Sequence, residues 1–415
     1  MQKQYFLTNR LAIVISIALF LLCIVLLYLY YSHSRPSIKI GILHSLSGTM
    51  AVSESPLVDA LQLAIEEANA TDGINGQLIE ALVVDCRSDA GYCAEQAERL
   101  ITEEKVSVLF GCWTSSCRKA VKPVVEKHQH LLFYPVQYEG MEQSANIIYT
   151  GAAPNQQIIP GARWALEKLG KRVYLAGSDY VFPRMANIII KDVLKAGGGV
   201  LAGERYLPLG ADSMDALVAD IGRQRPDVIL NTLNGDSNVA FFNALEKAGS
   251  GAAEIPVLSF SMAEVELAGM GKPVAAGHYA VWNYFQSIVS PQNQVFVGNF
   301  RKRYGMHRVL DDPMEASYTG MKLWLQAARE AGSAAPVDVQ RTILRQTLNA
   351  PVGMVAIDAD SRHLWKTPRI GKIGQDGQFD IVWDAGSAME PAPFPGYRFR
   401  DEWLRLLAQA ERSLP

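Results

Sequence analysis

The feature that most constrains the fold is an alternation of short apolar strands with helices between about residues 38 and 134. A strand, a helix and a second strand build a parallel sheet with helices on its faces, because a parallel connection has to cross back over the sheet. The predicted strands are Ile38–Leu43, Leu78–Asp85, Val106–Gly111 and Leu131–Tyr134, and the predicted helices are Pro56–Asn69, Ala94–Glu104 and Ser116–Lys127.

A second series of the same kind follows and predicts a second unit of similar size. Three consecutive glycines, Gly197 to Gly199, end its first helix, since glycine adopts a left-handed conformation without a steric penalty. The predicted strands are Arg172–Gly177, Val200–Tyr206, Asp227–Thr232 and Pro256–Phe260, and the predicted helices are Pro183–Ala196, Met214–Arg223 and Asn238–Ala248.

The C-terminal third has a different character. It is too small and too mixed to form a third domain, so we expect it to return and complete both earlier units. Its predicted helices are Pro291–Tyr304, Pro313–Ala331 and Val337–Leu348, and its predicted strands are Val352–Ile357, Arg369–Ile373 and Gln378–Trp383.

The chain is therefore predicted to be an α/β protein of two doubly wound lobes. Its 415 residues suit two linked units better than one. We assign residues 38–150 and 286–348 to lobe 1, residues 151–285 and 349–395 to lobe 2, and residues 396–415 to a C-terminal tail with a helix near Glu402–Arg412.

The N-terminus predicts a membrane anchor. Leu11 to Tyr31 is an apolar run without a charge, and as a helix it would span about 30 Å, the thickness of a bilayer core. Lys3 and Arg10 precede it, which places residues 1–10 in the cytoplasm and everything beyond the linker at 32–37 outside. The predicted location is thus a single-pass inner-membrane protein with a periplasmic main domain. The alternative is a signal peptide cleaved near Ser32 to Ser34.

Composition and motifs exclude several classes of function. A formal net charge of −3 with no basic block gives no support for nucleic-acid binding. The sequence lacks a P-loop, a dinucleotide-binding glycine pattern, a nucleophile elbow and a zinc-protease motif. It also shows no nucleophile with its base, so we predict neither an enzyme nor a cofactor.

Four cysteines lie in the exported part of the chain, where disulfides form. Cys86, Cys93, Cys112 and Cys117 allow three full pairings, and the sequence does not select one. Free buried thiols are an open alternative. A zinc site is disfavoured, because neither pair has the spacing of structural zinc ligands.

The loops that follow the predicted strands form the candidate binding site. In doubly wound sheets, ligands bind beyond the carboxyl ends of the strands. These loops carry hydroxyl groups, aromatic rings and helix N-terminal N–H groups with few charges, at His44–Met50, Cys112–Ser116, Tyr134–Gly140, Ser178–Phe182 and Asn231–Asn238.

Several of these stretches resemble one family. They are similar to the short-chain amide and urea receptors among the type I periplasmic binding proteins, and closest to the receptor of urea transporters. The stretches are Gly111–Val121 (GCWTSSCRKAV), Tyr134-Pro135 with Tyr138–Gly140, Gly151–Gln156 (GAAPNQ), Gly177–Pro183 (GSDYVFP) and Asn231–Asn238 (NTLNGDSN).

The resemblance implies two lobes joined by three crossovers, which close on a ligand in the cleft. The aliphatic-amide sensor has tyrosine at the position of Trp113 and threonine-proline at Val136-Gln137, so the resemblance favours urea over acetamide-type ligands. By resemblance, the positions that contact the amide are Trp113, Ser115, Tyr134, Val136, Gln137, Tyr180 and Phe182.

The chemistry of urea agrees with such a pocket. Urea is planar and neutral, with N–H donors on both nitrogens and one strong acceptor oxygen, so it needs flat walls, a donor and acceptors. Ser115 or the N–H groups of its helix would donate to the oxygen, and Glu54 and Asp236 are candidate acceptors.

The function predicted from the sequence is a membrane-tethered receptor that delivers urea or a short amide to an ABC permease. A sensor that reports the same ligand to a regulatory partner shares this fold and is the alternative. An amide-hydrolysing enzyme is disfavoured, because no catalytic set of residues is visible.

Overall fold

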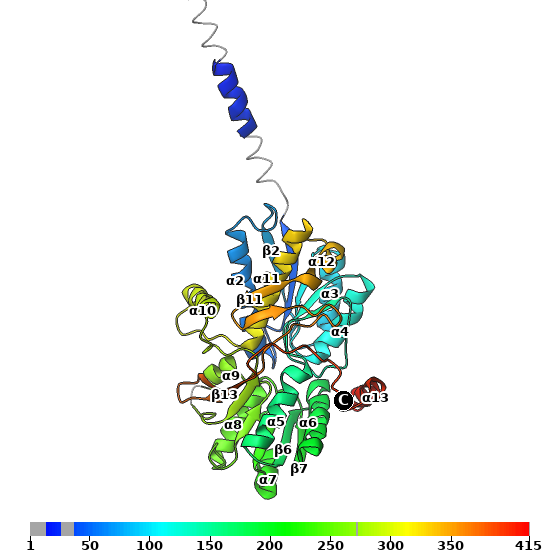
Figure 1. Ribbon diagram of the computed structural model, residues 1–415, viewed down its shortest axis with the longest axis vertical. Coiled ribbons are helices and arrows are strands. Elements are labelled where there is room, and N and C mark those ends of the chain that lie inside the picture. The colour runs from blue at the N-terminus through cyan, green and yellow to red at the C-terminus, as the bar shows by residue number, and fades with distance from the viewer. Residues whose placement is uncertain (1–13, 26–36, 271–272, 415) are drawn as a thin grey trace, which may run out of the picture.

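The computed structural model describes residues 14–25, 37–270 and 273–414. Residues 14–25 form a helix with exposed side chains, which stands apart from two lobes arranged end to end (Figure 1). No helix within the described ranges has both the length and the apolar character needed to cross a membrane. Residues 1–10, the linker at 32–36 and both ends of the predicted anchor Leu11–Tyr31 lie outside the described residues.

Lobe 1 is built on a parallel sheet of five strands in the order β2-β1-β3-β4-β5. The four strands predicted for this lobe are present, and the third begins at Leu109 rather than Val106. The fifth was not predicted, because three residues carry too little pattern to distinguish a strand from a loop. The strands are β1 (Ile38–His44), β2 (Ile79–Asp85), β3 (Leu109–Gly111), β4 (Leu132–Tyr134) and β5 (Ile147–Tyr149).

Polar caps fix where the helices of lobe 1 begin. Asp89 accepts a hydrogen bond from the N–H of Tyr92, Thr114 from that of Cys117, and Asp311 from that of Met314, which satisfies N–H groups that have no acceptor inside the helix. The helices of this lobe are α2 (Ala51–Asn69), α3 (Ala90–Thr102), α4 (Ser115–Lys127), α10 (Pro291–Tyr304) and α11 (Asp312–Ala331).

Lobe 2 is built on a sheet of seven strands in the order β14-β13-β10-β9-β8-β6-β7. The two strands at one edge, β13 and β14, are antiparallel and come from the C-terminal third, as the sequence predicts for that block. The strands are β6 (Arg172–Ser178), β7 (Val200–Leu207), β8 (Val228–Thr232), β9 (Val257–Ser259), β10 (Tyr279–Trp282), β13 (Arg369–Ile373) and β14 (Phe379–Asp384).

Helices cover both faces of this second sheet. The helix α6 ends at Gly198, which has a φ of +67°, so the predicted glycine stop is confirmed. The C-terminal helix α13 (Arg400–Arg412) packs against α6 and buries Trp403, and it lies on the flank of lobe 2 (Figure 1). The other helices are α5 (Ile158–Lys168), α6 (Val181–Gly197), α7 (Asp215–Gln224), α8 (Asp236–Lys247) and α9 (Glu264–Gly269).

The predicted helix Val337–Leu348 is wrong in its second half. The α-helix α12 (Pro336–Thr342) ends early, a 3₁₀ turn follows, and β11 (Thr347–Ala350) pairs with β12 (Gly353–Ala356). Pro351 disfavours helical backbone at Ala350, the last residue of β11, and pairing with β12 holds the rest of the strand extended. Val352 and Val355 of this hairpin belong to the core of lobe 1.

The chain passes between the lobes three times. It leaves lobe 1 after β5, returns from β10 to α10, and leaves again after β12 for β13. Each lobe has its own apolar core, one in lobe 1 and two on opposite faces of the sheet in lobe 2. Two separately packed lobes on a few connecting segments can move against each other as units.

Candidate ligand-binding cleft

The loops at the carboxyl ends of both sheets meet between the lobes. Trp113, which follows β3, donates from Nε1 to Asn234 Oδ1, which follows β8, at 3.3 Å. Gln137, which follows β4, donates from Nε2 to the carbonyl of Phe260 at 2.8 Å and to Ser261 Oγ at 3.0 Å. These hydrogen bonds join the two lobes, so the structure is a closed form of the cleft.

Tyr134 and Tyr180 approach each other from opposite lobes. Burial in the first place, and then the neighbouring Tyr134 and Glu139, raise the pKa of Tyr180 well above its usual value. The ring centroids of Tyr180 and Phe182 lie 6.3 Å apart. With the buried Trp113 on the lobe 1 side, the structure brings together four of the aromatic side chains expected at the site.

The two tyrosine hydroxyl groups differ in what they bind. Tyr134 donates to the backbone carbonyl of Trp113 at 2.6 Å, so its hydroxyl proton is already engaged. The hydroxyl of Tyr180 has no hydrogen-bond partner among the described residues. Tyr134 therefore supports the wall of the cleft, whereas Tyr180 has a free polar group.

A buried charge network lies behind Ser115. The Ser115 hydroxyl donates to Glu139 Oε2 at 2.5 Å and accepts from Arg118 at 3.0 Å. Arg118 also binds Glu139 Oε1 and Glu142 Oε1, each at 2.9 Å. The serine hydroxyl is thus used within the protein. The N–H of Cys117 donates to Thr114, so the free donors among the described residues at this point are the backbone N–H groups of Ser115 and Ser116.

The charged side chains of this network form ion pairs with one another. Burial lowers the pKa of Arg118, but Glu142 and Glu139 outweigh burial and hold that pKa well above the usual value. Burial raises the pKa of Glu142, but Arg118, Lys122 and Lys119 outweigh it and lower that pKa to about 2. Arg118 is consequently no free cation for an anionic ligand.

Gln137 leaves one acceptor free. Its Oε1 atom is buried and has no hydrogen-bond partner within the described chain, although its Nε2 is fully used across the cleft. A buried acceptor without a partner costs about 1–3 kcal/mol, so a ligand donor at this atom would be favourable.

Glu54 and Asp236 are not brought to the aromatic cluster. Glu54 is buried inside lobe 1, where Oε2 accepts from the N–H of Ser45 at 2.9 Å and lies 3.1 Å from His44 Nδ1. Asp236 is exposed at the first residue of α8. Val136 is buried in the core of lobe 1 beside Gln137.

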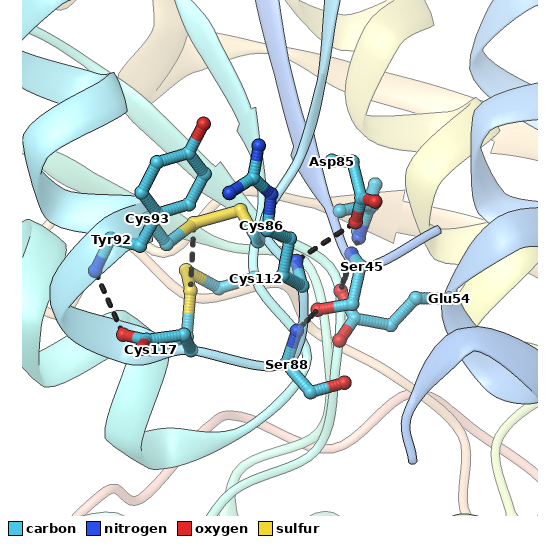
Figure 2. Close-up of a disulfide and its surroundings, with 12 residues drawn as sticks. Ser45, Glu54, Asp85, Cys86, Ser88, Tyr92, Cys93, Cys112 and Cys117 are labelled. Atoms are coloured by element: carbon cyan, nitrogen blue, oxygen red, sulfur yellow. Dashed lines mark hydrogen bonds and ion pairs between the residues drawn. A yellow bond between two sulfur atoms is a disulfide. The ribbon is translucent and has the colours of Figure 1, made fainter. Parts of the chain in front are cut away.

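Two disulfides hold the loop that carries Trp113 and Ser115 (Figure 2). Cys112 pairs with Cys117 across this loop, and Cys86 pairs with Cys93 beside it, with Cys93 Sγ 3.4 Å from Cys117 Sγ. Cys112 has a φ of +64°, a left-handed backbone that is uncommon outside glycine. Of the three full pairings that the sequence leaves open, the structure has the one that joins Cys86 to Cys93 and Cys112 to Cys117.

Four residues of the cleft were not among the expected ligand positions. Asn234 and Ser261 make the cross-lobe contacts, and Arg118 and Glu139 form the buried network. Asn234, Glu139 and Arg118 lie inside stretches that carry the family resemblance, so a signal for them exists. Ser261 has none, because its role depends on a partner distant in sequence.

Two separately packed α/β lobes with a closed, polar and aromatic cleft define a solute-binding protein rather than an enzyme. The sequence matches the family described as "Periplasmic binding protein domain" over residues 38–400, and the chain belongs to that family. Its main domain is therefore a non-enzymatic, extracytoplasmic binding component.

Related sequences agree with this assignment. The chain is 23% identical over 353 residues to "Leu/Ile/Val-binding protein homolog 6" of Brucella melitensis, covering 82% of this chain and 89% of the relative. It is 25% identical over 390 residues to "Leu/Ile/Val-binding protein homolog 7" of Brucella suis, covering 86% and 94%. A stretch of 124 residues, 30% of this chain, is 37% identical to "Limonene hydroxylase" of Geobacillus stearothermophilus but spans only 22% of that protein.

Solved structures share the fold. A solute-binding protein of an ABC transporter from R. palustris, in complex with 4-hydroxybenzoate, superposes with a TM-score of 0.76 at 23% identity, covering 85% of this chain and 98% of that one. The branched-chain amino acid binding protein LivJ of Streptococcus pneumoniae, in complex with isoleucine, superposes with a TM-score of 0.74 at 19% identity, covering 86% and 100%.

Proposed function

We propose that this protein is a receptor for urea or a short-chain amide, which it delivers to an ABC permease when its lobes close. One observation carries the proposal: Gln137 bridges the lobes and leaves Oε1 buried and free. This acceptor belongs to the loop after β4, which also carries the buried Tyr134 and Val136. A small planar molecule with N–H donors satisfies such a site.

The pairing of the buried charges argues against an amino-acid ligand. An amino acid presents a carboxylate, which a cation or backbone N–H groups can bind, and an ammonium group, which needs an acceptor with a full charge. Arg118 binds Glu139 and Glu142, and Glu54 lies beside His44, so these charges are used within lobe 1. The backbone N–H groups at the start of α4 can bind an amide oxygen as well as a carboxylate, so only the ammonium group disfavours an amino-acid ligand.

The proposal includes tethering of the receptor by the apolar run Leu11–Tyr31, on the strength of its length and lack of charge. N-terminal sequencing of protein isolated from membranes tests it. A mature N-terminus near Arg35 would show that the run is removed. A receptor that reports the ligand to a regulatory partner could use the same cleft, and a test of uptake in cells lacking the protein separates the two roles.

Calorimetry on the full-length protein in detergent tests the ligand. Four heavy atoms at a ceiling of about −1.5 kcal/mol each give about −6 kcal/mol, hence a Kd on the order of tens of micromolar for urea. Urea is expected to bind saturably and to be recovered unchanged. Saturable heat from leucine or benzoate, with none from urea or acetamide, would overturn the proposal.

A further inference from the structure

A second contact between the lobes lies away from the aromatic cluster. Ser53, in the first turn of α2 in lobe 1, donates to Glu266 Oε1 of α9 in lobe 2 at 2.6 Å. Both side chains are buried, and Val265 of α9 packs against the core of lobe 1. Movement of lobe 2 away from lobe 1 would separate α9 from α2 and return the Glu266 carboxyl group to water.

Further carboxyl groups gather around Glu266. Glu264 of α9 and Asp311 at the start of α11 are also buried, and each has one oxygen, Glu264 Oε2 and Asp311 Oδ2, without a hydrogen-bond partner among the described residues. The other oxygen of Asp311 accepts a hydrogen bond from the N–H of Met314, and the other oxygen of Glu264 accepts one from the N–H of Gln286. We call Glu264, Glu266 and Asp311 the carboxyl cluster.

Few cations face this cluster. From the segment after β12, Lys366 lies 3.6 Å from Asp312 Oδ1, and it also acts on Glu315. Arg301 and His307 line a cavity of about 670 Å³ that Glu264 borders. On the α2 side, Glu54 lies beside His44. The titratable groups that surround the carboxyl cluster are thus His44, Glu54, Tyr284, Arg301, His307, Asp312, Glu315 and Lys366.

A metal ion does not explain how the cluster is neutralised. Within the described parts of the chain, only a set of three cysteines has ligand atoms close enough together to hold a metal ion, and no set of these carboxylates does. Unpaired carboxylates are costly to bury, and in that situation a carboxyl group takes up a proton instead.

The direction of titration agrees with this geometry. Burial in the first place raises the pKa of Glu264 to about 8, and burial also raises the pKa values of Glu266 and Asp311. Glu266 lies at the contact that opening would expose, so its pKa should fall toward the ordinary value once the lobes separate. The closed form then binds more protons than the open form, which favours closure at low pH and weakens it as pH rises through the raised pKa of Glu266.

The geometry points to Glu266 as a positioning residue for cleft closure, with closure coupled to the uptake of a proton by the carboxyl cluster. The inference rests on the two-lobed receptor fold and not on urea as the ligand. A receptor of this design holds its ligand more tightly in mildly acidic surroundings than in alkaline ones.

The test uses the full-length protein without ligand, so that a wrong choice of ligand does not affect it. Leu46 and Asp212 are exposed and lie in loops of opposite lobes beside the cleft, so Leu46→Cys and Asp212→Cys with Cys23→Ser provide two positions for spin labels. Pulsed electron paramagnetic resonance then measures the distance between the two labels. The ratio of short to long distances gives the ratio of closed to open protein, and it is followed between pH 6 and pH 9. The expected ratio falls with rising pH, by up to about tenfold per pH unit for one proton.

Two neutral variants and one control decide the outcome. Glu264→Gln replaces an oxygen that has no partner, and Glu266→Gln keeps an acceptor for Ser53; both should flatten the pH dependence at least threefold. Glu103→Gln, at an exposed position in lobe 1, should leave it unchanged. A purely structural role would shift the ratio equally at every pH. An unchanged slope in both variants, or no slope in the parent, would overturn the inference.

Discussion

Gln137 of lobe 1 and Ser261 of lobe 2 are joined across the cleft by a hydrogen bond of 3.0 Å, yet the other polar atom of the same Gln137 amide has no partner. One side chain thus contributes to closure through Nε2 and offers an acceptor through Oε1. The proposed function therefore couples closure to recognition of an N–H donor at this residue, because the hydrogen bonds that hold the amide form only when lobe 2 is in place.

Replacing Gln137 by leucine should weaken urea binding strongly. Gln137→Leu removes both the cross-lobe donors and the free acceptor at similar volume, and loss of a hydrogen bond of 1–3 kcal/mol corresponds to about 5- to 150-fold in Kd. Calorimetry measures the effect. Gln409→Leu, on the exposed face of α13, is the matched control and should bind as the parent does.

The two cleft tyrosines should respond differently to loss of the hydroxyl group. Tyr180→Phe removes a hydroxyl that binds nothing in the protein, so we expect weaker urea binding by about 5-fold or more with an unchanged melting temperature. Tyr134→Phe breaks the bond to the Trp113 carbonyl and should lower the melting temperature by about 2–4 °C. Equal melting temperatures with equal affinities in both variants would contradict this assignment of roles.

The Cys112–Cys117 disulfide should matter for binding as well as for stability. It closes a loop of few residues, for which the chain-entropy estimate is about 2 kcal/mol, and it holds the left-handed backbone next to Trp113. Cys112→Ser with Cys117→Ser is expected to lower both the unfolding free energy and the affinity for urea. Cys23→Ser, outside both disulfides, is the control, and a double variant with full affinity would show that the loop keeps its shape unaided.

The ion pairs of Glu142 should make part of the stability dependent on acid pH. Its pKa is lowered to about 2 in the folded protein, from an ordinary value near 4.5, so its contribution is present above about pH 4.5 and is lost as pH falls toward 2. Glu142→Gln should therefore unfold more easily at neutral pH and lose less stability than the parent over that range. Denaturant unfolding at pH 7, 4 and 3 measures this difference, and parallel curves for both proteins would refute it.

Much of the fold followed from local pattern. The strand Ile38–His44 and the helix Val181–Gly197 have long apolar or amphipathic patterns and clear end signals, and both were predicted within a few residues. The strand Ile147–Tyr149 and the helix Glu264–Gly269 were not, since elements of three and six residues form in place through their neighbours.

The sequence by itself determined the class of protein: repeated strand-helix alternation specifies two doubly wound lobes, and the loops after the strands specify where a ligand would bind. Only the tertiary structure decided what each polar side chain does. Ser115 was expected to donate to the ligand, but its hydroxyl binds Glu139 and Arg118. Glu54 was expected to accept from the ligand, and one of its oxygens lies beside His44 and accepts from the N–H of Ser45. The reason is physical: a side chain's hydrogen bonds depend on partners that folding brings from distant segments. The local sequence pattern does not show which segments these are.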